Sequence, residues 1–277
     1  LFRSMGQRMP MPFAYGKRGS GKGTMIQSLT RMWGDKQDQI MLGGATTVVG
    51  FMRKMAQFSN GLVWLDEYKN NLQIKVIESI KNLYDRIGYE RGKKDNGFST
   101  ESTPILSAVF LSGQEMPTAE PALFTRTILL TFSETKRTEK DREEYRKLLR
   151  MEEEGLSHLT VALLSNREDI ERDFQQTYEQ ELRDLSTDVN NNDIDERLLG
   201  NYSMLIATAR IMDNLNLLPF SIDVFKTQCI SILMNQYFIL KGSDDTSKFW
   251  QVVEQLVSTY IIKEEEHYKL ANGYIYI

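Results

Sequence analysis

The chain has 277 residues, of which 41% are hydrophobic and 26% are charged, and its formal net charge is −4. These values are typical of a globular protein, and no segment approaches the ~18 uninterrupted apolar residues of a membrane span, so we expect no membrane partner. The one cysteine, Cys229, excludes an internal disulfide, and two distant histidines provide no zinc-ligand spacing with it. We therefore expect a cytoplasmic protein.

Short apolar runs alternate with helix-length segments in the first half of the chain. The runs span 11–15, 40–44, 61–67, 105–113 and 127–132, and helices are expected over 22–34, 46–59 and 71–87. Near-continuous apolar strands separated by helices indicate a largely parallel sheet that is covered on both faces. The sequence thus predicts an α/β fold with a five-stranded, mainly parallel sheet.

The second half of the chain is charge-dense and poor in strands. Helical periodicity predicts helices over 138–165, 167–186, 195–217, 220–240 and 246–264. The last residues alternate around Asn272-Gly273, which is a strong signal for a β-hairpin. We therefore predict an α/β domain over residues 1–135 and an all-helical domain over 136–277 that ends in a winged-helix-like hairpin.

A phosphate-binding loop follows the first predicted strand, in the stretch YGKRGSGKGT (15–24). The spacing Gly16-x-x-x-x-Gly21-Lys22, between a strand and a helix, is that of a P-loop, in which backbone N–H groups wrap phosphates. Gly23 stands directly after the lysine, where Ser or Thr is usual, so Thr24 is the candidate hydroxyl for Mg²⁺. The predicted nucleotide-binding residues are Gly16, Arg18, Gly19, Ser20, Gly21, Lys22, Gly23 and Thr24.

Two adjacent carboxylates end the apolar run GLVWLDE (61–67). Behind a P-loop, the first acid, Asp66, is placed to hold Mg²⁺, and the second, Glu67, is placed to polarise an attacking water. This pair favours hydrolysis of ATP. The alternative interpretation is that both acids simply begin a solvated loop.

Polar residues follow the fourth predicted strand, and an arginine precedes the fifth. Ser112 and Gln114 lie where a parallel sheet binds ligands, and either one could orient the water or contact the γ-phosphate. Arg126 stands among apolar and small residues, and arginine stabilises the charge of a transferring phosphoryl group. A solvated strand end and a surface ion pair are the alternatives.

Together, these motifs resemble the AAA+-like ATPase module of superfamily 3 helicases and of phage and mobile-element primase-helicases. The resemblance covers roughly residues 10–133, and any primase activity would lie upstream of this chain. Carried over by position, the functional residues are the Walker A lysine Lys22, the Walker B acids Asp66 and Glu67, the sensor-1 residue Ser112 or Gln114, and the arginine finger Arg126, which acts in trans.

That family has a DNA-contacting hairpin between the Walker B helix and the sensor strand. The corresponding interval here holds RIGYERGKKDNGF (86–98), in which Arg91, Lys93 and Lys94 are the candidate nucleic-acid ligands. Basic residues beside aromatic ones suit the phosphates and bases of a single strand. Solvated lysines on a surface loop are the alternative.

The leading hypothesis is a replicative DNA helicase motor, the helicase part of a primase-helicase. It would hydrolyse ATP with Mg²⁺ and translocate on single-stranded DNA as a homo-oligomeric ring, such as a hexamer. One alternative is an AAA+ regulatory or remodelling ATPase that acts on a protein partner. Another is a nucleotide kinase, because GSGKGT also resembles the loop of adenylate-kinase-type enzymes; Glu67 and the lack of an arginine-rich lid argue against it.

Overall fold

A computed structural model describes residues 8–34, 39–42, 47–92, 100–134, 136–189, 193–258, 261, 263, 267–271 and 274–276. The chain forms two compact units, residues 1–235 and residues 236–277. The predicted boundary near residue 135 marks the change from the α/β layer to helices, and as a domain boundary it stays a prediction. Among the described residues, no helix has both the length and the apolar character needed to cross a membrane.

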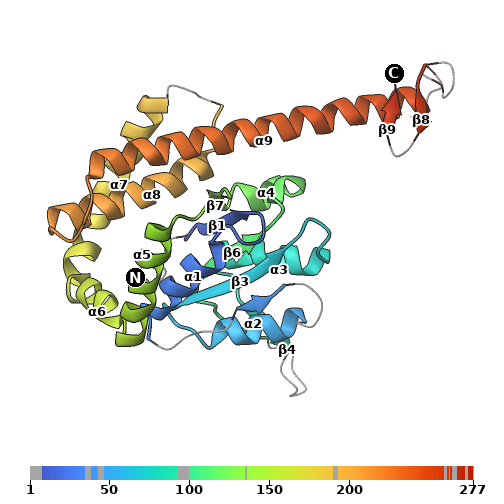
Figure 1. Cartoon of the computed structure of the whole chain (residues 1–277). Helices are drawn as coiled ribbons and strands as arrows, with labels where there is room; N and C mark the ends of the chain where they lie inside the picture. The colour runs from blue at the N-terminus through green and yellow to red at the C-terminus, as the bar shows by residue number, and fades with distance from the viewer. Residues whose placement is uncertain are drawn as a thin grey trace. The chain divides into compact units, whose positions relative to one another are not determined.

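Five parallel strands form the central sheet of the first unit, in the order β2-β3-β6-β1-β7 (Figure 1). The prediction of a five-stranded parallel sheet is confirmed, and every pairing within it is parallel. Because β6 is inserted between β1 and β3, the carboxyl ends of these three strands are neighbours. The strands are β1 (Met11–Gly16), β2 (Ile40–Met41), β3 (Leu62–Tyr68), β6 (Ala108–Gly113) and β7 (Thr127–Phe132).

Helices connect these strands much as the periodicity predicts. They are α1 (Lys22–Arg31), α2 (Val48–Ala56), α3 (Ile74–Tyr84) and the short α4 (Pro121–Phe124). Parallel crossovers are right-handed, so α1, which leads toward β2, covers one face, while α2 and α3, which lead back, cover the other. On the α1 face, Ile26 packs with Ala14, Trp64 and Phe110 in a buried apolar cluster.

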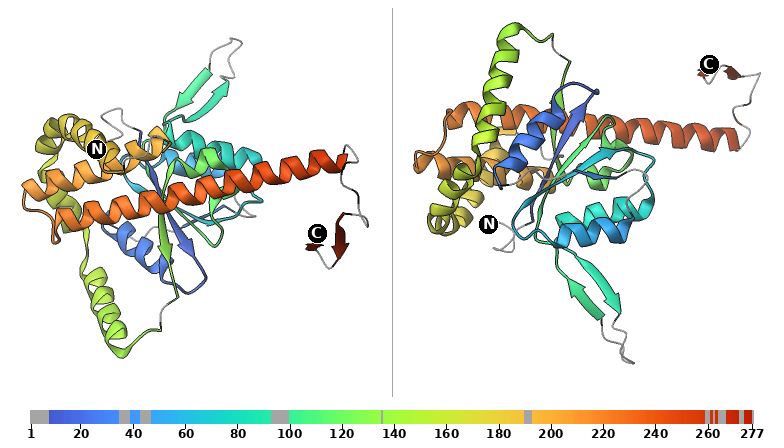
Figure 2. Two further views of the ribbon diagram at one scale, coloured as in Figure 1. Left: turned by 90° about the horizontal axis from the view of Figure 1, so that it is seen from above. Right: turned by 60° about the horizontal axis from the view of Figure 1, so that its bottom comes forward.

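A two-stranded antiparallel ribbon, β4 (Tyr89–Gly92) and β5 (Thr100–Thr103), precedes β6. It pairs Tyr89 with Thr103 and Gly92 with Thr100, and it projects from the α/β layer (Figure 2). The predicted hairpin therefore exists in this interval. Its tip, residues 93–99, lies outside the described residues.

The helical region that follows β7 contains α5 (Glu139–Glu154), α6 (Ser157–Ser165), α7 (Arg167–Val189), α8 (Glu196–Asn214) and α9 (Ile222–Ser258). The sequence predicted one helix over 138–165, but Gly155, with φ of 101°, ends α5 and separates it from α6. In the first unit, α7 packs against α8, where Phe174 and Met204 share a buried cluster with Ile211.

The prediction of two helices over 220–240 and 246–264 is wrong, because α9 is one continuous helix through this interval. A single glycine, Gly242, costs a helix only ~1 kcal/mol, which is too little by itself to end a helix of this length. In the second unit, β8 (Lys269–Ala271) pairs antiparallel with β9 (Tyr274–Tyr276). The predicted turn, Asn272-Gly273, lies outside the described residues, and the winged-helix character stays a prediction.

Candidate nucleotide-binding site

The P-loop joins the end of β1 to the start of α1, where the sequence predicts it. Gly21 caps α1 in the left-handed conformation, with φ of 98° and ψ of −3°, which glycine adopts without strain. At Gly16, a Cβ would collide with the backbone carbonyl of Phe132 in the neighbouring strand β7. Both glycines are thus required by the backbone path of the loop.

Lys22, at the first position of α1, turns its ammonium group back over the loop. Its Nζ donates to the carbonyl oxygens of Gly16 (2.5 Å) and Lys17 (2.7 Å) and lies 3.4 Å from the hydroxyl of Ser20. Burial lowers the pKa of Lys22, and the negative charge of Asp66 opposes this shift. The lysine and the first predicted acid are therefore electrostatically coupled.

The predicted acidic pair occupies a β-bulge in β3. Leu65 lies opposite Leu111 and Tyr68 opposite Gly113, so β3 has one more residue than β6 over this interval. Glu67 is exposed and has φ of 60°, a left-handed conformation that is uncommon for a residue with a side chain. Such bulges interrupt the regular alternation of side chains and are frequent next to active sites, and here the bulge contains both acids.

Ser112 and Gln114, the two sensor candidates, have different environments at the end of β6. Ser112 is buried, and its hydroxyl donates to Asp66 Oδ1 (2.5 Å) and accepts from Trp64 Nε1 (2.6 Å). Gln114 is exposed beyond the strand end. The structure thus brings Ser112 together with Asp66 and leaves the Gln114 side chain accessible.

Positions 23 and 24 face different neighbours. A Cβ at Gly23 would lie 3.4 Å from the ring edge of Trp64, whereas Thr24 lines a pocket between α1 and α5. The hydroxyl of Thr24 is therefore displaced from the side of α1 that faces β3. The structure therefore does not bring Thr24 together with Asp66.

The described residues contain no cluster of three or more metal-binding side chains. Mg²⁺ bound to a nucleotide does not require one, because it keeps several waters and takes one or two carboxylates plus phosphate oxygens. Asp66 fits that requirement: it is half-buried, Ser112 engages its Oδ1, and within the described chain no hydrogen bond engages its Oδ2.

One pocket, of about 620 Å³, lies at another edge of the first unit. A second pocket, of about 910 Å³, opens directly beside the P-loop. The second pocket lies between α1 and α5 and has mainly apolar walls. Its residues include Gly21, Thr24, Met25, Leu29, Tyr145, Leu148 and Leu156. A pocket of this size and character, open to a phosphate loop, can accept a nucleobase.

Polar contacts fix α5 and its leading segment against the P-loop and α1. Arg137 donates to the carbonyl oxygen of Gly19 (2.9 Å). The buried carboxylate of Glu152 pairs with Arg31 (3.1 Å) and accepts a hydrogen bond from Ser28. The sequence did not indicate these contacts, because their partners lie more than 100 positions apart, as in the 124 positions between Ser28 and Glu152.

Arg126 lies at the opposite edge of the sheet from the P-loop. Its carbonyl accepts a hydrogen bond from Met11 at the start of β1, whereas the P-loop follows the other end of that strand. A strand of six residues is about 20 Å long, so Arg126 does not reach the P-loop of its own chain. The structure therefore does not bring Arg126 together with the other predicted site residues.

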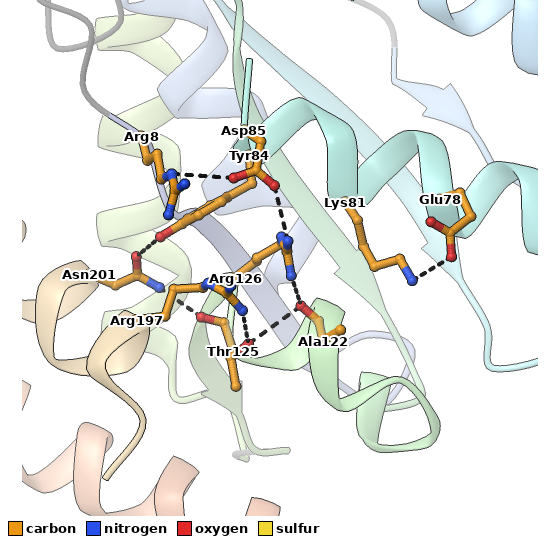
Figure 3. A network of polar contacts seen from close by, with 10 residues as sticks. All are labelled: Arg8, Glu78, Lys81, Tyr84, Asp85, Ala122, Thr125, Arg126, Arg197 and Asn201. Atoms are coloured by element: carbon orange, nitrogen blue, oxygen red, sulfur yellow. Dashed lines mark hydrogen bonds and ion pairs between the residues drawn. The ribbon is translucent and has the colours of Figure 1, made fainter. Parts of the chain in front are cut away.

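Within its own chain, Arg126 belongs to a polar network at the end of α3 (Figure 3). Its guanidinium pairs with Asp85 (3.0 Å), donates to the carbonyl oxygen of Ala122 (2.6 Å) and lies over the ring of Tyr84. Arg8 also pairs with Asp85, at 3.3 Å. The side chain of Arg126 is 14% exposed, so the network holds it largely buried.

The network continues into the helical region through α8. Tyr84 donates its hydroxyl to Asn201 Oδ1 (2.8 Å), and Asn201 Nδ2 donates to the carbonyl oxygen of Thr125 (3.0 Å) (Figure 3). Arg197 lies 3.4 Å from the Thr125 hydroxyl. These contacts link the segment before β7, the end of α3 and the start of α8.

Of the three candidate DNA ligands, only Arg91 lies in a described part of the chain. It belongs to β4, opposite Glu101 in β5. Lys93 and Lys94 fall in the tip of the ribbon, outside the described residues. Their role in nucleic-acid binding stays a prediction.

Comparison of the sequence with protein-family models finds no match, and comparison with curated proteins finds none either. Among solved structures, the chain is similar to an active helicase, Cch of SCCmec type IV, with a TM-score of 0.57 and 12% sequence identity. The similarity covers 96% of this chain and 51% of the other, so this chain spans about half of that helicase's length. At this identity, the likeness shows a common fold.

Proposed function

We propose that this chain is an ATP-hydrolysing DNA helicase motor that translocates on single-stranded DNA as a ring. The observation that supports it most directly is the convergence of three elements at adjacent strand ends. The P-loop follows β1, the polar end of β6 lies beside it, and the bulged acids of β3 come next. Parallel sheets bind ligands at this edge.

In this mechanism, Lys22 and the P-loop amides bind the β- and γ-phosphates of ATP. Asp66 is the residue that would hold Mg²⁺, which neutralises charge on the phosphate oxygens when it is bound. Glu67 orients and polarises the attacking water. Gln114 lies at the same edge of the sheet and contacts the γ-phosphate. Arg126 is too far from the P-loop of its own chain, so the arginine-finger role assigned to it would require a neighbouring subunit to receive it.

The nucleobase is assigned to the pocket between α1 and α5. This pocket shares Gly21 and Thr24 with the phosphate loop, and its walls are mainly apolar, with one aromatic side chain, Tyr145, and charged residues such as Arg137 and Asp141. The binding of ATP would then connect the α/β layer to α5. The likeness to an active helicase and the projecting β4–β5 ribbon both favour DNA as the moving substrate.

The test is the ATPase rate per subunit as a function of protein concentration, with and without single-stranded DNA. We expect the rate to rise with both and to fall at least 100-fold in Glu67→Gln, since loss of a water-activating group typically costs ~10²–10⁴ in rate. Mixing inactive Glu67→Gln with inactive Arg126→Ala subunits should restore part of the activity, because some interfaces then contain both intact groups.

Other outcomes lead to other functions. A rate that ignores DNA would contradict the motor and favour a regulatory or remodelling ATPase with a protein partner. Absence of free phosphate together with phosphorylation of AMP would favour a nucleotide kinase. Mixed subunits without activity, despite intact folding of each variant, would contradict the role of Arg126 in trans.

A further inference from the structure

A hydrogen-bonded chain of three side chains connects the core of the sheet to the proposed magnesium ligand. Trp64 Nε1 donates to Ser112 Oγ at 2.6 Å, and Ser112 Oγ donates to Asp66 Oδ1 at 2.5 Å. Trp64 and Asp66 are two residues apart in β3 and so lie on one face of the strand. Ser112 is on the adjacent strand β6, between them.

The chemistry of the donors sets the direction of this chain. An indole N–H can only donate, so the serine oxygen must accept from Trp64. The single hydroxyl proton of Ser112 is then available to Asp66, which as a carboxylate only accepts. Both protons are thus used, and Ser112 has no proton left to donate to a γ-phosphate.

Packing fixes Trp64 at the other end of the chain. Its ring is buried in the cluster of Ala14, Ile26 and Phe110, and its far edge faces α1 at Gly23. A larger residue at position 23 would press on that ring, since even a Cβ would already be in contact at 3.4 Å. The indole therefore occupies the side of α1 where the usual P-loop hydroxyl would project.

We propose that Trp64 and Ser112 are positioning residues that hold the carboxylate of Asp66 for Mg²⁺. This inference rests on the proposed function, in which Asp66 binds the metal of the nucleotide. With Oδ1 engaged by Ser112, the carboxylate is oriented and keeps Oδ2 for the ion. Ser112 is then excluded as the sensor of the γ-phosphate, and that role passes to Gln114.

The test measures nucleotide affinity by titration calorimetry, first with Mg²⁺ and then with EDTA. Residues that support a metal ligand typically cost 10–100-fold in metal affinity when they are replaced. In Trp64→Phe and Ser112→Ala, we therefore expect the gain in ATP affinity that Mg²⁺ provides to fall about 10-fold or more, with affinity in EDTA unchanged. The double variant should lose no more of this gain in affinity than Ser112→Ala alone, because both changes interrupt the same series of hydrogen bonds.

The chain offers matched controls for both substitutions. Trp33 is 45% exposed, and Ser107 is buried with no hydrogen-bond partner for its hydroxyl among the described residues. Trp33→Phe and Ser107→Ala should leave the Mg²⁺ gain unchanged. Thermal unfolding of each variant identifies any that fails to fold. If Ser112→Ala fails to fold, Trp64→Phe, which keeps an aromatic ring, still tests the positioning role.

The outcomes separate this inference from the proposed function. Equal Mg²⁺ gains in wild type and both folded variants would overturn the positioning role, and so would a wild type without any Mg²⁺ gain. A wild type that shows the gain, loses it in the variants and yet hydrolyses no ATP would support the positioning role and contradict the motor. Lys22→Ala should weaken binding with and without Mg²⁺.

Discussion

Asp85 forms ion pairs with two arginines, and the two arginine side chains differ in how far they are exposed to solvent. Arg8 is 63% exposed, whereas Arg126 is 14% exposed and relies on Asp85 for its charge partner. Removing one partner of a largely buried ion pair is costly, because the remaining charge stays desolvated. Asp85 therefore restrains the arginine that the proposed mechanism assigns to a neighbouring subunit.

We expect Asp85→Asn to lower the free energy of unfolding by about 2 kcal/mol, between the values for exposed and fully buried pairs. In the motor, the same change should lower the protein concentration needed for half-maximal ATPase, since Arg126 is no longer held within its own chain. Denaturant unfolding and concentration-dependent ATPase assays check both effects. Arg8→Ala is the control and should cost less than about 0.5 kcal/mol. A fall in ATPase that only follows the lost stability would contradict the restraint.

At this scale, the placement of residues in a short motif could be predicted from sequence, while their roles stay part of the proposed function. The P-loop and the pair Asp66-Glu67 are of this kind, and the structure brings them to one sheet edge. Side-chain pairings across the fold could not be predicted, because Trp64 and Ser112 are 48 positions apart and Asp85 and Arg126 are 41 apart. The β-bulge at Glu67 could not be predicted from the sequence either, because it arises from the register between two strands.

Among the helices and strands, α5 is the element that would affect binding of the nucleobase. It forms one wall of the apolar pocket beside the P-loop, with Leu148 and Tyr145 among the lining residues. A larger side chain in that wall should exclude the base while the phosphate loop stays intact. Under the proposed function, the binding of the base and the binding of the phosphates can therefore be tested separately.

We expect Leu148→Trp to weaken ATP binding about 10-fold and to leave the binding of inorganic tripolyphosphate unchanged, because one well-packed contact is worth ~1–3 kcal/mol. Competition titrations with a fluorescent ATP analogue measure both affinities. Leu149, which is 38% exposed and absent from the pocket lining, provides the matched control Leu149→Trp. Equal affinities of wild type and Leu148→Trp for ATP would contradict this location of the base.

Elements with strong periodicity were predictable, and their ends depended on local chemistry. The strands of the sheet differ from their predicted ranges mainly at the ends, because uninterrupted apolar runs mark buried parallel strands. The helices were harder to delimit: Gly155 ends α5 inside the single helix predicted over 138–165, and Gly242 lies within α9, between the two helices predicted over 220–240 and 246–264. A glycine alone does not decide between these outcomes, since it can either leave the helix in a left-handed conformation, as Gly155 does with φ of 101°, or stay helical, as Gly242 does.

For the molecule as a whole, buried groups that prefer the neutral state make stability sensitive to alkaline pH. Burial raises the pKa of Cys229 to about 12, from 9.0, and burial is also the main cause that raises those of Tyr68 and Tyr84 to about 12, from 10.0. In the unfolded chain, these groups lose their protons first. Their contribution to stability is therefore complete below pH 9 and is lost as the pH rises toward 12.

We expect the free energy of unfolding to decline above pH 9, with a slope of up to ~1.4 kcal/mol per pH unit for each group that titrates. Denaturant unfolding between pH 7 and pH 11 measures this decline. Cys229→Ala should remove the part that begins near pH 9, and Tyr84→Phe should reduce the part that begins near pH 10. A profile that is identical in all three proteins would contradict the assignment to these groups.

The place of β1 in the sheet also determines when the site can form during synthesis. β1 lies between β6 and β7, so its two partners are residues 108–113 and 127–132, far along the chain. At ~5–20 residues per second, a ribosome needs on the order of ten seconds to deliver them after the P-loop has emerged. The P-loop is therefore synthesised before both partner strands of β1 but is among the last parts of the α/β layer to assemble, and until then its apolar strand is a target for chaperones.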